Sequence, residues 1–143
     1  MAEQDADQDQ EQMLIAEIIR SAKVIAVVGL SPNSTRPSHG VAAYLQAHGF
    51  QIVPVNPQVE EVLGEKSYPS LRDVPVQVDI VDVFRQSEYV PAIAEDAVAI
   101  GAKALWTQFG VISEEGAEIA RRGGLKVVMD RCLKIEHAAL TRS

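Results

Sequence analysis

Five short apolar runs, separated by segments with helical periodicity, constrain the fold of this chain more than any other feature. Four of them are rich in β-branched residues and bounded by Gly, Pro or Asp, which is typical of buried strands in a parallel sheet. Because strand and helix alternate along the chain, we predict an α/β fold: a Rossmann-like, doubly wound parallel sheet of five strands with flanking helices, in a single domain. The runs are VIAVVG (24–29), QIVPVN (51–56), DIVDVF (79–84), ALWTQF (104–109) and KVVMD (126–130).

Helical periodicity fills most of the segments between the runs. We predict helices over residues 38–48, 87–100 and 113–122, and another that begins near residue 12. Ser87 and Ser113 stand where N-caps are expected. The connection 57–78 contains three prolines and a glycine, so we expect only a short helix near 70–73. The residues after Cys132 are expected to add a last helical turn or two.

The negative charge is concentrated at the N-terminus. The chain has 20 acidic and 13 basic residues, a net charge of −7, and five of the acids lie within the first 11 residues. Without those five the rest has a net charge near −2 and no basic stripe, which argues against nucleic acid as a partner. Residues 1–11 have almost no apolar content, so we expect a disordered acidic tail there and a folded domain over 12–143.

Nothing in the chain predicts export or membrane insertion. The N-terminus has neither a basic start nor an apolar core segment, and no apolar run approaches the ~20 residues of a membrane span. The single cysteine, Cys132, cannot form an internal disulfide, which agrees with a reducing compartment. We therefore expect a cytoplasmic protein without a membrane partner.

The loop after the first run lies where an α/β sheet usually receives phosphate groups. It differs from the dinucleotide fingerprint G-x-G-x-x-G, because the next glycine after Gly29 is Gly40. The second run ends at Asn56, where an NAD-binding protein usually has Asp or Glu. No Gly-Lys-Ser/Thr sequence is present, so the loop is not a Walker loop either. These departures weaken an NAD interpretation.

In place of the missing glycines, the segments after the predicted strands carry hydroxyl and guanidinium side chains. Ser31 and Ser34 stand beside Arg36, whose planar guanidinium suits phosphate oxygens. Arg85 and Arg131 follow later runs and are expected at the same edge of the sheet. Each arginine alone is equally consistent with a surface ion pair, but three together favour a ligand with several phosphates.

The other reactive residues give weaker signals. Cys132 follows a buried run and is more typical of a packed residue than of a nucleophile. Trp106 is expected in the core, and Asp79 and Asp82 on opposite faces of a strand. Asp130 is placed to orient Arg131 or to cap its loop. We predict no metal site and no catalytic residues, because neither metal-ligand spacing nor a nucleophile–base–orienter set is recognisable.

Five motifs in order resemble one family. GLSPNSTRPSHGVAAYL, VPVNP, DIVDVFR, ALWTQFGV and VVMDRCLKIEH are similar to the small stand-alone CoA-binding proteins, whose fold is like the CoA-binding domain of the succinyl-CoA synthetase α subunit. The resemblance covers about residues 15–138. It implies a Rossmann-type fold with coenzyme A as the ligand. The synthetase's phosphohistidine domain and partner subunit have no counterpart in this chain.

The resemblance also implies a set of binding residues. Gly29, Leu30, Ser31, Ser34 and Arg36 belong to the implied phosphate loop. Asn56 and Pro57 would flank the nucleotide, and Val83, Phe84 and Arg85 would border the adenosine. Gln108, Phe109, Gly110 and Cys132 would lie at the pantetheine end, where Arg131 replaces an asparagine of the synthetase.

Three functional hypotheses follow. The first is a non-catalytic binding or regulatory module for CoA or an acyl-CoA at the carboxyl edge of the sheet. The second is an enzyme, either a component of an acyl-CoA-handling complex or an enzyme that uses Cys132 as its reactive group. The third is an NAD(H)-binding regulatory module on the same fold. An apolar face on the first helix permits a homodimer or another protein partner, but the same residues can instead cover the sheet.

Overall fold

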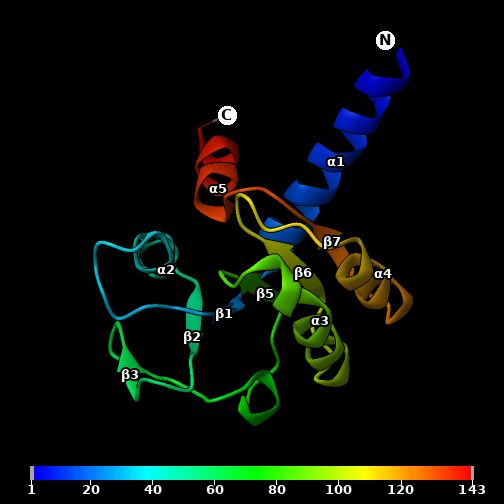
Figure 1. Cartoon of the computed structure of the whole chain (residues 1–143). Helices are drawn as coiled ribbons and strands as arrows, with labels where there is room; N and C mark the ends of the chain where they lie inside the picture. The colour runs from blue at the N-terminus through cyan, green and yellow to red at the C-terminus, as the bar shows by residue number, and fades with distance from the viewer. Residues whose placement is uncertain (1, 143) are drawn as a thin grey trace.

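A five-stranded parallel sheet forms the centre of the computed structural model, which describes the backbone of residues 2–142 and the side chains of residues 6–142. The strand order is β2-β1-β5-β6-β7, and every neighbouring pair is parallel (Figure 1). Each strand lies within one of the five apolar runs, so the predicted single-domain, Rossmann-like sheet is confirmed. The strands are β1 (Val24–Val28), β2 (Gln51–Val55), β5 (Ile80–Val83), β6 (Ala104–Thr107) and β7 (Lys126–Val128).

Helices cover both faces of the sheet (Figure 1). Helices α1, α2 and α5 pack on one face, and α3 and α4 pack on the other. Two single turns of 3₁₀ helix, η1 and η2, lie in the connections on either side of β5. The bounds are α1 (Ala2–Ser21), α2 (Pro37–Ala47), η1 (Leu71–Asp73), η2 (Ser87–Tyr89), α3 (Val90–Ala99), α4 (Glu114–Arg122) and α5 (Leu133–Thr141).

Alternate residues of β1 divide the core into two layers. Ile25 and Val27 pack with α1, α2 and α5, whereas Ala26 and Val28 pack on the side of α3 and α4. All four side chains are at most 8% exposed. Strands that are buried on both faces need apolar residues at every position, which is why the sequence shows continuous apolar runs.

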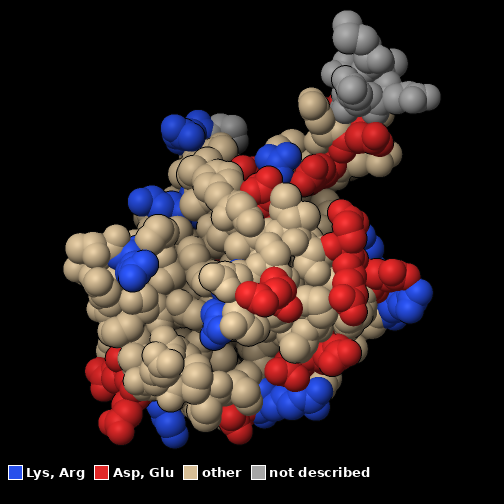
Figure 2. Space-filling model, in the orientation of Figure 1, with Lys and Arg blue, Asp and Glu red and all other residues tan. Residues whose placement is uncertain are grey.

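Helix α1 differs from the prediction for the acidic segment. The structure continues α1 back to Ala2, through residues that composition predicts to be disordered, while Met1 lies outside the described residues. Ala, Glu and Gln are strong helix formers, and acidic residues near a helix N-terminus interact favourably with its dipole. Figure 2 shows acidic side chains along this exposed part of α1 and over α4. The acidic segment is therefore a helical extension of the domain in this structure.

A small hairpin in the connection after β2 was not predicted. It consists of β3 (Glu61–Val62) and β4 (Glu65–Lys66), which pair antiparallel. Leu63 and Gly64 form its turn with φ angles of 55° and 76°. Two positive φ angles are what a two-residue hairpin turn requires, but Leu-Gly is a weak signal for one because leucine seldom adopts them. The short helix expected near 70–73 is present as η1.

The two predicted N-caps have different outcomes. Ser113 caps α4, since its Oγ accepts a hydrogen bond of 3.0 Å from the Gly116 N–H group. Ser87 does not cap a long helix, because η2 intervenes and α3 begins at Val90, next to Pro91. The Ser87 Oγ instead accepts the Ile112 N–H group at 2.9 Å. Proline favours the first turn of a helix, and this preference sets the start of α3.

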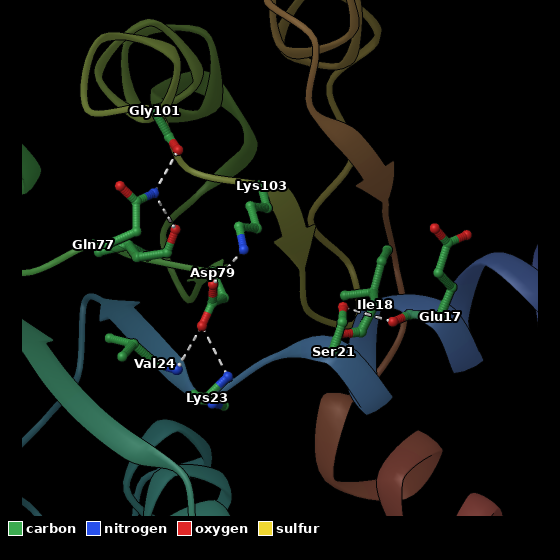
Figure 3. A network of polar contacts seen from close by, with 10 residues as sticks. Glu17, Ile18, Ser21, Lys23, Val24, Gln77, Asp79, Gly101 and Lys103 are labelled. Carbon is green, nitrogen blue, oxygen red and sulfur yellow. Dashed lines mark hydrogen bonds and ion pairs between the residues drawn. The ribbon is translucent and has the colours of Figure 1, made fainter.

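The amino edge of the sheet is fixed by Asp79 (Figure 3). Its Oδ2 accepts the N–H groups of Lys23 and Val24 at 2.8 and 2.9 Å, and its Oδ1 lies 3.5 Å from the Lys103 ammonium. Partial burial acts to raise the pKa of Asp79, but these hydrogen bonds and the Lys103 charge outweigh it and lower the pKa. Asp79 therefore joins three chain segments at the edge opposite the candidate site.

Candidate functional site

An open cavity of about 710 Å³ lies at the carboxyl edge of the sheet. Its size is in the usual range for small-molecule sites, and its place is where open α/β sheets bind ligands. The loops after β1, β5, β6 and β7 and the first turns of α2 form its wall. The lining residues are Gly29, Ser31, Arg36, Pro37, Ser38, Val41, Phe84, Arg85, Gln86, Gln108, Phe109, Gly110, Val111 and Cys132.

The loop after β1 is held by its own polar groups. Ser31 N–H donates to the Ser38 Oγ at 3.0 Å, and the Ser31 Oγ accepts Asn33 N–H at 3.1 Å. The Asn33 Oδ1 accepts both the N–H and the hydroxyl of Thr35, at 2.9 and 2.7 Å. The loop therefore has a defined shape without the glycines of a dinucleotide fingerprint.

Gly29 allows this loop to pass close to β5. Its φ is +85°, and a Cβ atom there would lie 3.0 Å from the Phe84 carbonyl oxygen. Its N–H group donates to the Val55 carbonyl at 2.9 Å. Both the left-handed backbone and the close contact require glycine.

Two of the three predicted arginines border the cavity. Arg36 and Arg85 are exposed, and the Arg85 guanidinium lies 4.3 Å from the centre of the Tyr89 ring. Arg131 is absent from the wall, because its guanidinium lies 3.1 Å from Glu11 and 3.7 Å from Glu136. Arg131 thus follows β7 at the predicted edge of the sheet, but its ion pairs hold the guanidinium away from the cavity wall. Glu11 reaches Arg131 from α1, a contact that the sequence does not reveal.

The wall opposite α2 comes from the loops after β6 and β7. Gln108 is buried, whereas Phe109 is 63% exposed beside it. Asp130 fixes the loop after β6, since its Oδ1 accepts Gly110 N–H at 2.7 Å; the cap is on this neighbouring loop and not on the loop that contains Asp130. Cys132 is 8% exposed and precedes α5.

Five predicted site residues lie outside this cavity. Leu30 and Val83 are fully buried in the core, and Ser34 is exposed on the loop. Asn56 joins two loops, because its Nδ2 donates to the Leu30 carbonyl at 3.0 Å and its Oδ1 accepts Gln58 N–H at 2.9 Å. Pro57 lines a neighbouring hollow of about 200 Å³, which shares Arg85 with the main cavity.

The other nine predicted residues meet in the cavity wall. They are Gly29, Ser31, Arg36, Phe84, Arg85, Gln108, Phe109, Gly110 and Cys132. The prediction did not include Pro37, Ser38, Val41, Gln86 and Val111 among its site residues. Pro37, Ser38, Val41 and Val111 lie inside the quoted motifs and Gln86 directly follows DIVDVFR, so counting every motif residue and one beyond would have found them.

A buried carboxyl lies directly behind the cavity wall. Asp82 is 0% exposed, and its Oδ1 accepts a 2.8 Å hydrogen bond from the Gln108 Nε2. Its Oδ2 has no hydrogen-bond partner among the described residues. Complete burial raises the pKa of Asp82 to about 7, although the Gln108 hydrogen bond acts to lower it. As predicted, Asp79 and Asp82 do not form a pair, since Asp79 bonds to the backbone at the other edge.

The family model described as "CoA binding domain" matches residues 23–138, a range that contains every residue of the cavity wall. This chain belongs to the CoA-binding domain family. The predicted resemblance is therefore confirmed. Within the described residues, no helix of this CoA-binding domain combines the length and apolar character that a membrane crossing requires.

Two relatives show how the domain occurs elsewhere. The chain is 43% identical to YneT of Bacillus subtilis (strain 168) over 124 residues, which cover 87% of this chain and 92% of YneT. It is 30% identical over 117 residues to an ADP-forming acetate–CoA ligase (II) of Archaeoglobus fulgidus, covering 73% of this chain but 17% of the ligase. The domain thus matches nearly all of a small protein and a limited part of a large ligase.

A solved structure has the same fold over nearly the whole chain. The structure of a hypothetical protein from Pyrococcus horikoshii OT3 superposes with a TM-score of 0.88 and is 39% identical. The match covers 91% of this chain and 92% of the Pyrococcus chain. The same fold therefore makes up nearly all of this Pyrococcus chain.

Proposed function

We propose that this protein binds coenzyme A or an acyl-CoA in the cavity at the carboxyl edge of the sheet, as a binding or regulatory module. The observation that carries the proposal is the convergence of Arg36, Arg85 and the Ser31 loop on one cavity in a chain of the CoA-binding domain family. CoA carries three phosphate groups, which match the exposed guanidinium groups of Arg36 and Arg85.

Different parts of the ligand occupy the cavity and the neighbouring hollow. The phosphates lie at the loop after β1, beside Arg36. The adenine occupies the hollow between Pro57 and Tyr89, where Arg85 separates it from the main cavity. The pantetheine arm follows the wall formed by Phe109 and Cys132. In this arrangement the charged phosphates lie beside a cationic side chain, and the uncharged pantetheine arm lies beside Phe109 and Cys132.

A role in acyl-CoA chemistry is the second candidate, because Cys132 lines the cavity where the thiol end of the ligand would lie. In that case the protein hydrolyses or transfers an acyl group from an acyl thioester, and Cys132→Ala abolishes the reaction. Incubation with acetyl-CoA and detection of the released thiol decide the question. If acetyl-CoA binds but is not turned over, the first proposal, a non-catalytic binding module, is retained.

Calorimetric titration of the ligand-stripped protein tests the proposal. We expect CoA to bind, 3′-dephospho-CoA to bind more weakly if the 3′-phosphate is recognised, and NAD to produce no heat. Binding of NAD without CoA would replace the proposal with the NAD(H)-module hypothesis. A cytoplasmic location and a homodimeric state stay predictions, which cell fractionation and sedimentation velocity address.

A further inference from the structure

Asp82 is a polar residue in the middle of a buried apolar strand. On the two neighbouring strands its register partners are Val27 and Trp106. Valine has no hydrogen-bonding side chain, and the Trp106 Nε1–H group donates instead to the Arg131 carbonyl at 2.8 Å. Among the residues that the structure describes, the one hydrogen bond to the Asp82 carboxyl therefore comes from Gln108. A buried carboxyl with an unpartnered oxygen costs folding free energy, so its presence calls for another role.

The contact with Asp82 determines how the Gln108 amide is turned. The Nε2 group of Gln108 faces the Asp82 carboxyl and donates to its Oδ1, so the Oε1 atom, on the other arm of the planar amide, points elsewhere. Among the described residues no hydrogen bond reaches Oε1. Since Oε1 is also not among the buried side-chain atoms that lack a partner, it is not fully buried. Gln108 also lines the cavity. Its carbonyl oxygen is thus the part of the amide left for a ligand.

We infer that Asp82 is a positioning residue, which turns the Gln108 amide so that its Oε1 accepts a hydrogen bond from a ligand N–H group. The inner wall of the cavity then selects a ligand segment with an amide N–H. This inference rests on the proposed function, because the pantetheine arm of CoA contains two secondary amides. Asp82 itself does not touch the ligand.

A comparison of two ligands distinguishes contacts with the amide-bearing arm from contacts with the nucleotide. CoA contains both, whereas adenosine 3′,5′-bisphosphate lacks the pantetheine arm. We expect Asp82→Leu, which keeps the branched shape of the side chain but accepts no hydrogen bond, to lower the affinity for CoA about 3- to 10-fold relative to that for the bisphosphate. Loss of the buried carboxyl alters the domain as a whole and hence the binding of both ligands, so the ratio of their affinities is the quantity to compare.

A double-mutant cycle tests whether Asp82 acts through Gln108. Asp82→Leu should change the affinity ratio in the wild-type background but not in the Gln108→Leu background. Asp79→Asn is the matched control, because it alters a carboxylate that lies beside β5 at the amino edge of the sheet. It should lower stability and leave the ratio unchanged. The inference is overturned if Asp82→Leu changes the affinity ratio equally in the two backgrounds. It is also overturned if the ratio changes in step with the unfolding free energy of the variants.

A ligand-free measurement separates this inference from the proposed function. In NMR spectra of the free protein, the side-chain amide of Gln108 should show one slowly exchanging proton, and Asp82→Leu should abolish its protection. Gln108→Leu identifies the signal. An unchanged Gln108 signal in Asp82→Leu overturns the positioning role even if CoA binds. A protected signal without any CoA binding keeps that role and overturns the choice of ligand.

Discussion

The Tyr44 hydroxyl and the His137 Nδ1 lie 2.8 Å apart and join α2 to α5 across the face of the sheet that α1 also covers. The His137 ring also contacts Phe50 and His48 edge to face, with ring centres 5.4 and 5.3 Å apart. Burial lowers the pKa of His137, and the charge of His48 lowers it further. This hydrogen bond therefore depends on a histidine that is held neutral.

Mild acid should destabilise this contact. Because the pKa of His137 is lower in the folded state, its contribution is complete above the ordinary histidine pKa of about 6.5 and is lost as the pH falls through the lower folded value. His137→Gln does not titrate and should flatten this part of the stability profile. Urea unfolding at pH 7.5 and 5.5 measures the unfolding free energy of the wild type and of His137→Gln. Parallel profiles for the two would contradict the assignment.

Asp82 should have the opposite pH dependence. Its pKa is raised from 3.8 to about 7, so folding favours the protonated form and stability decreases as the pH rises from about 4 to 7. Three pKa units correspond to about 4 kcal/mol, an upper estimate for the gain from Asp82→Asn at pH 8. Urea unfolding at pH 5 and pH 8 should show a larger stability difference between the two proteins at the higher pH. A difference independent of pH would refute the claim.

Arg36→Ala should weaken CoA binding several-fold and leave the fold intact. Arg36 is exposed, borders the cavity and makes no side-chain cap to α2, so its loss removes a phosphate partner without opening the core. Arg121→Ala is the control, since Arg121 is an exposed arginine of α4. Calorimetry with CoA, together with circular dichroism, checks both variants. Equal affinity in Arg36→Ala and Arg121→Ala would remove the phosphate role of Arg36.

Gly29→Ala should lower both stability and CoA affinity. Its positive φ and the contact with the Phe84 carbonyl would cost about 1–3 kcal/mol together, and the loop would shift away from the cavity. Gly49→Ala is a close control, because Gly49 also has a positive φ of 95° but has open space around it. The extra loss of unfolding free energy in Gly29→Ala measures the close contact. No difference between the two variants would mean that the contact is unimportant.

The sheet could be predicted because burial on both faces leaves a strong local signal. Every residue from Ile80 to Val83 is buried, and the run DIVDVF shows this apart from its acids. The carboxyl-edge loops followed from strand direction alone. Asp82 was recognisable as unusual, but its tie to Gln108 depends on how two strands align, which the sequence does not display.

Long-range pairs explain most of what the prediction missed. Arg131 lies at the predicted edge, but Glu11, 120 residues earlier, pairs with its guanidinium. The Asn56 amide joins the loops that follow β1 and β2, and its place beside a ligand stays a prediction. In both cases the motif position gives the edge of the sheet, and a residue far along the chain sets the side-chain contact. Helix α1 extends through the acidic segment because its residues favour helix without needing a buried face.

The Asp79 contacts at the amino edge have a practical consequence for engineering. They fix the starts of β1 and β5 through side-chain and backbone groups that are far along the strands from the cavity loops. The exposed positions 32–36 and 109 can therefore be varied while the strands stay aligned, as long as Gly29, Leu30 and Gln108 are kept. The domain is in this sense a modular scaffold, in which recognition of a new ligand can be selected at one rim without redesign of the other.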